Sequence, residues 1–377
     1  MSVWTELVGQ RHAVEVLGAA VADPSAMTHA WLLTGPPGSG RSNAARAFAA
    51  ALQCEQGGCG RCQACTTTLA GTHADVTVVA TEKSIISIDE VRELIGVAQR
   101  SPSQGRWRIV IVEDADRMVE RTSNVLLKAL EEPPPRTVWL LCAPSPQDVV
   151  VTIRSRCRGV ALRVPPVEDV AALLVERDGA DPDVALLAAR AAQSHIGLAR
   201  RLARDPAARE RRTRTLRLAA EIRGVGDAIL AAADLVEVAT AESKAATEDR
   251  DAAEKAALLH TLGADGVGTL PPSVRSQVKQ LEDEQKRRAT RAQRDVLDRT
   301  LLDLLSLYRD VLVVQLGADV DLVNPVHEDI RRLAAASTPE QTIRRMDAIG
   351  EARERLEGNV APLLAMEAMA VALRPQG

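Results

Sequence analysis

Short apolar runs, each bounded by turn residues, recur through the first 165 residues. Each run has the length of a β-strand that is buried on both faces, and helical patterns separate most of them. This alternation predicts a parallel sheet covered by helices, which is the α/β class. The five predicted strands are His29–Gly35, Asp75–Ala80, Ile109–Glu113, Val138–Ala143 and Val160–Val164.

The pattern changes after Pro165-Pro166, where the strand-like runs stop. From there to about Arg223, Ala, Leu and Arg recur at helical spacing, and from Gly224 onwards the chain again has a helical pattern. We therefore expect three domains: an α/β domain over residues 1–165, a small all-α domain over 166–223, and an all-α domain over 224–377.

One predicted helix in the last domain is unusually polar. Pro271-Pro272 followed by Ser273 marks its start, with Ser273 as the expected N-cap, and it runs to about Leu316. Its middle, residues 282–294, is almost wholly polar. One interpretation is a basic stripe that faces DNA or a protein partner. The other, which we favour, is a solvated helix supported by pairs such as Glu282–Lys286. The stripe would consist of Lys286, Arg287, Arg288, Arg291 and Arg294.

Composition narrows the function classes. Aromatic residues make up only 2% of the 377 residues, which argues against a protein that binds single strands by stacking bases. The net charge of −4 provides no global basic field for nucleic acid. No apolar run approaches the roughly 18 residues of a membrane span, and the N-terminus lacks a signal-peptide pattern. We expect a cytoplasmic protein, in which clustered cysteines indicate a metal more often than disulfides.

The segment Gly35–Ser42, GPPGSGRS, follows the first predicted strand and opens a helix, as a phosphate-binding loop does. Gly35, Gly38 and Gly40 would let backbone N–H groups face phosphates, and Ser42 stands where a hydroxyl would bind Mg²⁺. Position 41 holds Arg instead of the usual Lys, and a planar guanidinium does not simply replace a compact ammonium. Binding of ATP and Mg²⁺ is therefore left open.

A second motif also departs from the pattern of an active ATPase. The run IVIVEDAD ends a predicted strand in acids, where a phosphate-loop ATPase places its Mg²⁺ ligand and catalytic carboxylate. The usual order is Asp then Glu, whereas this chain has Glu113 then Asp114. The shorter second side chain would reach an attacking water less well. Together the two departures predict a weakened or inactive ATPase site.

Four cysteines, Cys54, Cys59, Cys62 and Cys65, lie within twelve residues as C-x4-C-x2-C-x2-C. Four thiolates at this spacing can surround Zn²⁺ tetrahedrally, and a complete Cys₄ set leaves no open position, so the role would be structural. An iron–sulfur cluster is the main alternative, but its usual run continues C-x3-C-P, whereas Thr residues follow Cys65. A zinc-dependent DNA-binding module is disfavoured by the net charge.

Two arginines are candidates for contacting a nucleotide phosphate. The run TIRSRCR (Thr152–Arg158) contains Arg156, which is either part of a solvated loop or an arginine finger offered to a neighbour's γ-phosphate. Arg200 in GLAR stands early in a predicted helix, and by itself looks like a surface residue.

These motifs together resemble one family. HAWLLTGPPGSGRS, the four-cysteine insert, NVLLKALEEPP (Asn124–Pro134) and TIRSRC are similar to the AAA+ clamp-loader subunits of bacterial DNA polymerase III, over roughly residues 1–200. The resemblance implies an AAA+ module of the P-loop NTPase type, a small helical lid and a helical collar for oligomerisation. Motor subunits of the family keep Lys in the loop and Asp-Glu at the strand end. This chain departs at both positions, as the family's non-hydrolysing stator does.

The resemblance also implies roles and partners. Zn²⁺ would bind the four cysteines, Arg156 of the Ser-Arg-Cys motif would be a finger acting in trans, and Arg200 would be the lid arginine that senses nucleotide. The partners would be a motor subunit of the gamma/tau type, a delta subunit, the sliding β clamp and primer–template DNA. No polymerase or exonuclease pattern occurs in this chain, so any DNA polymerase activity would belong to the holoenzyme.

Overall fold

The computed structural model describes residues 2–81, 85–262, 264, 271–324, 327–358 and 360–375. The chain forms two compact units, Met1–Arg204 and Asp205–Gly377, and each is described by itself.

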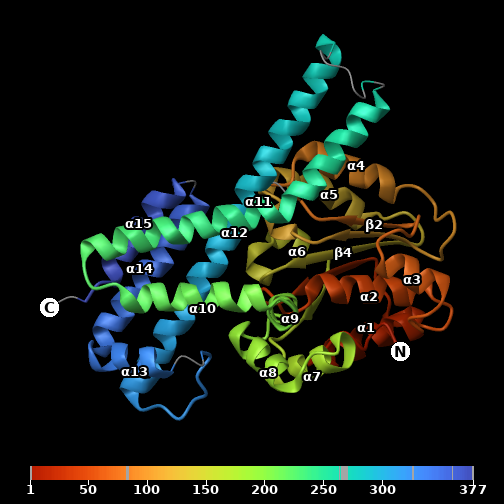
Figure 1. The fold of residues 1–377 in the computed structure, drawn as a ribbon. Coiled ribbons are helices and arrows are strands. Elements are labelled where there is room, and N and C mark those ends of the chain that lie inside the picture. The colour runs from red at the N-terminus through yellow and green to blue at the C-terminus, as the bar shows by residue number, and fades with distance from the viewer. Residues whose placement is uncertain are drawn as a thin grey trace. The chain divides into compact units, whose positions relative to one another are not determined.

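The first unit is built on a five-stranded sheet in the order β2-β3-β4-β1-β5 (Figure 1). β1 pairs with β4 and β5, and β3 pairs with β2 and β4, all in parallel. The predicted α/β class and the five strands are confirmed, although the last strand begins and ends earlier than expected. The strands are β1 (Ala30–Thr34), β2 (Val76–Val79), β3 (Arg108–Val112), β4 (Thr137–Ala143) and β5 (Arg158–Ala161).

Helices cover both faces of this sheet, because successive strand residues point to opposite faces. On one face Trp31 packs edge-on against Phe48 at 5.1 Å between ring centroids, within a core that also contains Leu17. On the other face Trp139 packs in a core with Leu126. The helices are α1 (Arg11–Ala22), α2 (Arg41–Gln53), α3 (Gln63–Leu69), α4 (Ile88–Ala98), α5 (Glu120–Glu131) and α6 (Val151–Arg154), with short 3₁₀ turns at Pro24–Ala26, Ala115–Arg117 and Pro146–Asp148.

Three helices complete the first unit: α7 (Val167–Asp178), α8 (Pro182–Ala191) and α9 (Ile196–Arg204). The helix that follows, α10 (Pro206–Glu221), belongs to the second unit. The expected helical character of residues 166–223 is confirmed. The domain boundaries at 165 and 223 stay a prediction.

In its described residues, the second unit consists of helices and connecting loops, with no strand. Its core consists mainly of Ala and Leu side chains around the fully buried Tyr308. α12 begins at Pro272 with Pro271 at the N-cap position, so the expected Ser273 cap is wrong. Among the described residues, we find no helix with both the length and the apolar character needed to cross a bilayer. Besides α10, its helices are α11 (Val225–Thr261), α12 (Pro272–Leu316), α13 (His327–Ala335), α14 (Pro339–Glu357) and α15 (Pro362–Leu373).

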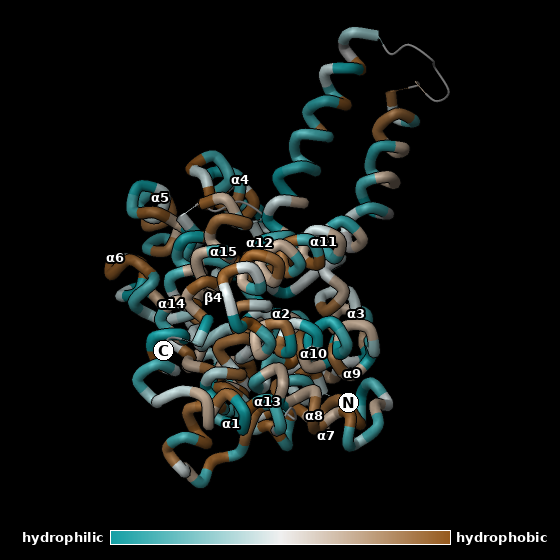
Figure 2. Tube along the Cα trace, turned by 60° about the vertical axis from the view of Figure 1, so that its left-hand side comes forward, coloured by the Kyte–Doolittle hydropathy of each residue, from teal (hydrophilic) through white to brown (hydrophobic). Residues whose placement is uncertain are grey.

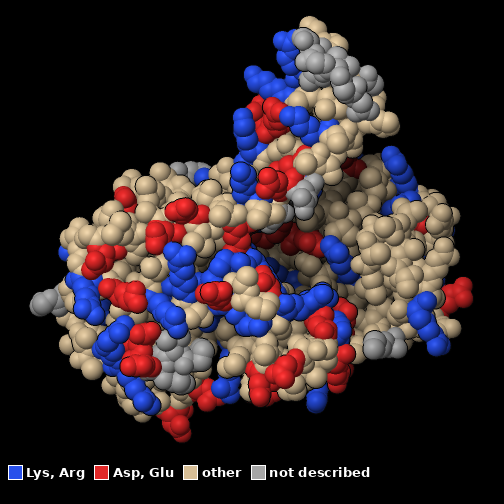
Figure 3. All heavy atoms as spheres, in the orientation of Figure 1, with Lys and Arg blue, Asp and Glu red and all other residues tan. Residues whose placement is uncertain are grey.

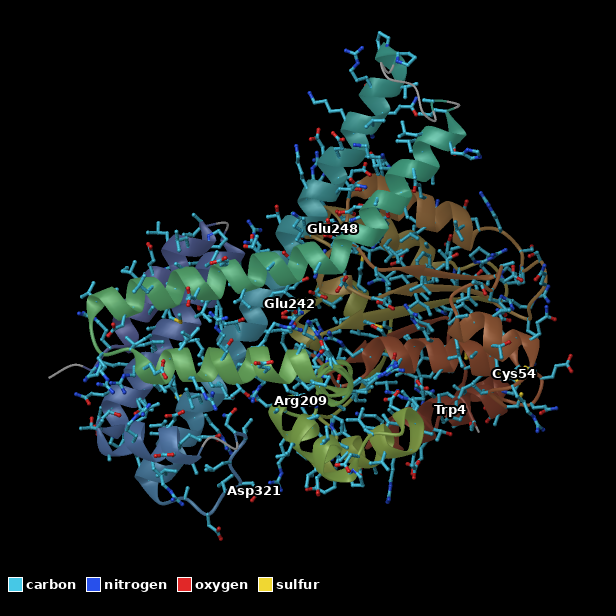
Figure 4. The ribbon with its side chains drawn as sticks, viewed as in Figure 1. Trp4, Cys54, Arg209, Glu242, Glu248 and Asp321 are labelled. Carbon is cyan, nitrogen blue, oxygen red and sulfur yellow. The ribbon has the colours of Figure 1, made fainter. Side chains whose placement is uncertain are left out.

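The far ends of α11 and α12 form a two-helix projection, here called the arm (residues 240–261 and 272–295), whose trace is mostly hydrophilic (Figures 1 and 2). Ion pairs join its helices: Lys255 lies 2.7 Å from Glu282, and Arg288 lies 3.1 Å from Asp251. Nearer the body of this unit, Glu242 of α11 forms an ion pair with Arg299 of α12 at 3.3 Å (Figure 4).

Both signs of charge occur along the arm in Figure 3, with Lys and Arg gathered along one edge. The polar stretch of α12 is thus neither wholly a solvated helix nor wholly a free basic stripe. Arg288 faces α11, whereas Lys286 and Arg287 are exposed. Glu282, expected to pair with Lys286, pairs with Lys255 of the other helix.

Candidate nucleotide and metal sites

The carboxyl ends of parallel strands meet at one edge of a sheet, and most of the candidate nucleotide residues lie there. The glycine-rich loop follows β1 and leads into α2, and the acids Glu113 and Asp114 follow β3. The order β3-β4-β1 places one strand between them. Cys142 in that strand is fully buried, and burial raises the pKa of its thiol to about 12, so it is a core residue.

The loop has the backbone that its glycines permit. Gly38 has φ +85° and Gly40, the N-cap of α2, has φ +89°, in the left-handed region that favours glycine. A Cβ on Gly38 would lie 2.7 Å from the Cβ of His195. His195, in the turn before α9, therefore packs directly on the loop. Its Nδ1 accepts a hydrogen bond from the N–H of Leu198 at 3.2 Å.

Arg41, which stands where the motif usually has lysine, is hydrogen-bonded to its own loop. Nη1 of Arg41 donates to the carbonyl oxygen of Gly35 at 2.7 Å. Ser42 follows it in the first turn of α2, half-buried. Ser39 is almost fully buried, and its hydroxyl has no hydrogen-bond partner among the described residues. The loop is therefore closed by its own arginine and by His195.

The acids after β3 are also engaged. Glu113 accepts hydrogen bonds from Nη2 and Nε of Arg46 at 2.9 and 3.2 Å. Asp114 lies 3.8 Å from Arg117. Burial, followed by the charge of Asp114, raises the pKa of Asp116. A metal ion at these acids would have to compete with Arg46 for the carboxylate of Glu113.

A cavity of about 700 Å³ lies beside the loop, within the size range of small-ligand pockets. It is lined by residues 9–13 and by the chain after β5, including Arg163 and Asp169. Gln10 connects the cavity to the loop, because its Nε2 donates to the carbonyl oxygens of Ser39 at 3.2 Å and Arg163 at 2.7 Å.

Arg200 is not turned toward the loop. It lies in α9, and its Nε is 2.9 Å from the carboxylate of the buried Asp178. His195, from the same part of the chain, packs against Gly38, whereas Arg200 pairs with Asp178.

The four cysteines form one cluster at the end of α2 (Figure 4, Cys54). Their sulfur atoms all lie within 4.8 Å of one another, and those of Cys62 and Cys54 are 3.7 Å apart. Ligands 2.3 Å from a tetrahedral Zn²⁺ are about 3.8 Å from each other, so this spacing fits zinc. Gly58, with φ +107°, supports the loop, because a Cβ there would lie 2.6 Å from Val3.

Backbone donors favour the thiolate form at two of the cysteines. Burial opposes ionisation of Cys54, but N–H groups of residues 59, 58 and 56 lower its pKa to about 6. N–H groups of Arg61 and Cys62 lower the pKa of Cys59. Burial raises the pKa of Cys65 in the absence of a cation. The cluster is thus a closed Cys₄ site that can hold a structural metal.

Arg156 lies just after α6, outside the nucleotide site of its own chain. Its Nε donates to the carboxylate of Glu131 at 2.8 Å, and its Nη1 donates to the carbonyl oxygen of Thr152 at 2.7 Å. The side chain is 34% exposed. The guanidinium is therefore at the surface and held by its own chain.

Sequence reasoning missed Arg46, His195, Gln10 and Glu131. Each acts through a contact between segments far apart in the chain: 67 residues separate Arg46 from Glu113, and 25 separate Glu131 from Arg156. No local spacing signals such pairs. The only local clue to Arg46 is that it lies on α2 four residues, about one helical turn, after Ser42.

Comparison with known proteins supports the motifs. Residues 9–166 match the family model described as DNA polymerase III, delta subunit. The DNA polymerase III subunit delta' of Pseudomonas aeruginosa is 40% identical over 143 residues, which cover 36% of this chain and 44% of that protein. The gamma/tau subunit of Mycobacterium tuberculosis H37Rv is 34% identical over 191 residues, which cover 48% of this chain and 33% of that protein.

The matched segments thus span less than half of either relative. Among solved structures, a gamma subunit-related protein of DNA polymerase III from Thermotoga maritima overlaps 96% of this chain and 98% of its own, with a TM-score of 0.45 and 17% identity. The sequence matches cover the phosphate loop, the cysteine cluster and the arginine of the Ser-Arg-Cys motif in one segment. Through this segment, the chain is similar in sequence to the delta, delta' and gamma/tau subunits of DNA polymerase III.

Proposed function

We propose that this chain is the delta-prime subunit, the stator, of a DNA polymerase III clamp loader. In this role it is a cytoplasmic protein in a ring of AAA+ subunits, with a gamma/tau motor and a delta subunit as neighbours. The ring uses ATP to load the sliding β clamp onto primer–template DNA. The C-terminal helices of residues 224–377 serve as the collar that joins the subunits, and residues 166–223 serve as the lid.

The observation that carries the stator assignment is the pair Arg46–Glu113. An active motor needs its acids free for Mg²⁺ and water, whereas Glu113 here is bound by a guanidinium of its own chain. The bond from Arg41 to Gly35 and the packing of His195 on Gly38 act in the same direction. All three contacts favour a chain that does not hydrolyse ATP.

The contribution of such a chain to ATP hydrolysis comes from Arg156. As a surface guanidinium beyond its own nucleotide site, it can engage a neighbouring subunit once its bonds to Glu131 are released. Placed against the γ-phosphate of ATP in that neighbour, it would stabilise the charge of the transition state. In GTPase systems such a finger raises the rate by about 10³–10⁵. The Cys₄ zinc site has a structural role in this proposal.

The test is Arg156→Ala in a loader reconstituted with motor and delta subunits. We expect clamp- and DNA-stimulated ATP hydrolysis to fall at the site that faces this chain. Arg154→Ala is the matched control, because Arg154 is a nearby half-buried arginine that bonds only the backbone of Pro146 among the contacts described for it. Unchanged hydrolysis in Arg156→Ala would refute the finger.

An active motor of the gamma/tau type is the second candidate. The 34% identity to a gamma/tau subunit and the cavity beside Gln10 favour it. Titration of the purified chain with labelled ATP separates the two candidates. Tight Mg²⁺-dependent binding with turnover, lost in Arg41→Ala, would favour the motor, whereas binding without turnover or no binding favours the stator.

A further inference from the structure

The guanidinium of Arg156 is held on several sides by groups of its own chain. Nε and Nη2 both donate to Oε1 of Glu131, the first at 2.8 Å. Nη1 donates to the carbonyl oxygen of Thr152 at 2.7 Å and, more weakly, to the hydroxyl of Ser155 at 3.4 Å. A guanidinium has five N–H donors, so these four bonds leave one for another acceptor.

The stability of α5 alone does not explain a glutamate at position 131. It is the last residue of α5, where the partial charge of the helix is negative and a carboxylate is disfavoured. Its own helix therefore does not hold the charge, and Arg156 is its counter-ion. The pair joins the end of α5 to the turn that follows α6, two segments that the fold brings together.

A γ-phosphate and a carboxylate are similar acceptors for this fork of donors, because both offer anionic oxygens that accept two N–H bonds. Arg156 cannot give Nε and Nη2 fully to both at once. We propose that Glu131 is a positioning residue for Arg156: it holds the guanidinium in the free chain and is displaced by the phosphate when the finger engages a neighbour. This inference rests on the finger role proposed above.

The exposure of the pair sets the size of the effect. The side chains of Arg156 and Glu131 are 34% and 47% exposed, so water already weakens their attraction. Surface pairs of this kind alter an equilibrium by up to about fivefold. Glu131 therefore holds the finger without locking it, and a phosphate with Mg²⁺ in the neighbouring site can replace it.

The experiment uses the reconstituted loader with Glu131→Gln, which keeps the length of the side chain and removes its charge. We expect the KM for ATP to fall about two- to fivefold, since the finger no longer has to leave a carboxylate before it engages. The stimulated kcat should not change, because Glu131 is displaced in both the bound and the transition state. Glu132→Gln, the adjacent exposed glutamate, is the matched control and should leave KM and kcat as they are.

A double-mutant cycle separates this role from general stabilisation of the fold. In an Arg156→Ala background, Glu131→Gln should have no effect on KM, because its only expected action is through the arginine. In the free chain, the Nε–H resonance of Arg156, assigned by its loss in Arg156→Ala, should shift in Glu131→Gln and stay in place in Glu132→Gln.

The outcomes distinguish the two proposals. If Arg156→Ala is without effect, the finger is refuted and this inference falls with it. If Arg156→Ala lowers hydrolysis but Glu131→Gln leaves KM unchanged, or lowers kcat, or acts equally without Arg156, the positioning role alone is overturned.

Discussion

Arg46 in α2 and Glu113 at the end of β3 form a two-point ion pair, with Nη2 and Nε of the arginine 2.9 and 3.2 Å from the same carboxylate oxygen. The pair crosses the edge of the sheet where a phosphate-loop ATPase would hold its metal. The guanidinium of Arg46 thus lies at Glu113, where a phosphate-loop ATPase would place the Mg²⁺ that accompanies ATP.

This pair leads to a prediction about repairing the site. Arg41→Lys alone should restore little nucleotide binding, because Glu113 remains bound to Arg46. Arg41→Lys combined with Arg46→Ala should tighten Mg²⁺-dependent binding of labelled ATP by at least about tenfold, which corresponds to one or two charge-assisted hydrogen bonds. Equal binding by the single and double variants would show that Arg46 does not obstruct the metal.

The contact between Gly38 and His195 leads to a second prediction. Gly38→Ala should destabilise the first unit by roughly 1–2 kcal/mol for the left-handed backbone, with an additional cost for the contact at 2.7 Å. His195→Gly in the same chain removes the Cβ and Cγ from the contact but keeps the Cα at 2.8 Å, so it should recover part of the contact cost and leave the backbone cost. Urea denaturation of the two single variants and the double variant measures this, and strict additivity of the two changes would contradict the packing.

The cysteine cluster predicts one zinc per chain. Cys62→Ser should lose the metal and lower the melting temperature of the first unit, because binding of a structural zinc contributes directly to folding. Cys157→Ser, a half-buried cysteine outside the cluster, should keep it. Metal analysis of both variants decides the matter, and iron with visible absorbance in place of zinc would contradict the assignment.

Asp75 gives a prediction about pH. Burial alone would raise the pKa of this fully buried carboxylate, but N–H groups of Ser103, Gly105 and Gln104 lower it to about 2. The lowered pKa means that the carboxylate stabilises the fold above its unfolded pKa of about 4, and that this contribution is lost as the pH falls toward 2. The shift corresponds to about 2–3 kcal/mol.

Asp75→Asn should therefore cost at least this amount at pH 7, since it also leaves the buried Arg108, 2.8 Å away, without its counter-charge. The free energy of unfolding of the variant should change less between pH 4 and pH 2 than that of the parent chain. Denaturant titrations at several pH values test this. A parallel pH dependence in both chains would show that other groups control acid stability.

The strands and the motifs could be predicted from the sequence, because each depends on a local signal. The run around Leu32 is apolar on both faces, which requires burial in a parallel sheet. The cysteine spacing similarly restricts the chain to one compact loop. The arm was only half anticipated. The sequence predicted the polar stretch of α12. It did not predict the pairing of Arg288 in that stretch with Asp251 of α11, because the two residues are 37 positions apart and no spacing rule connects them.

The sequence by itself determined which residues are available: glycines for a phosphate loop, an arginine at the lysine position, four thiols, and the arginine of the Ser-Arg-Cys motif. Only the tertiary structure decided what holds them. Arg46 reaches Glu113, His195 reaches Gly38 and Glu131 reaches Arg156 because sheet and helix packing brings distant segments within hydrogen-bonding or van der Waals distance. Such contacts depend on three-dimensional distance rather than separation along the chain, so no local pattern encodes them.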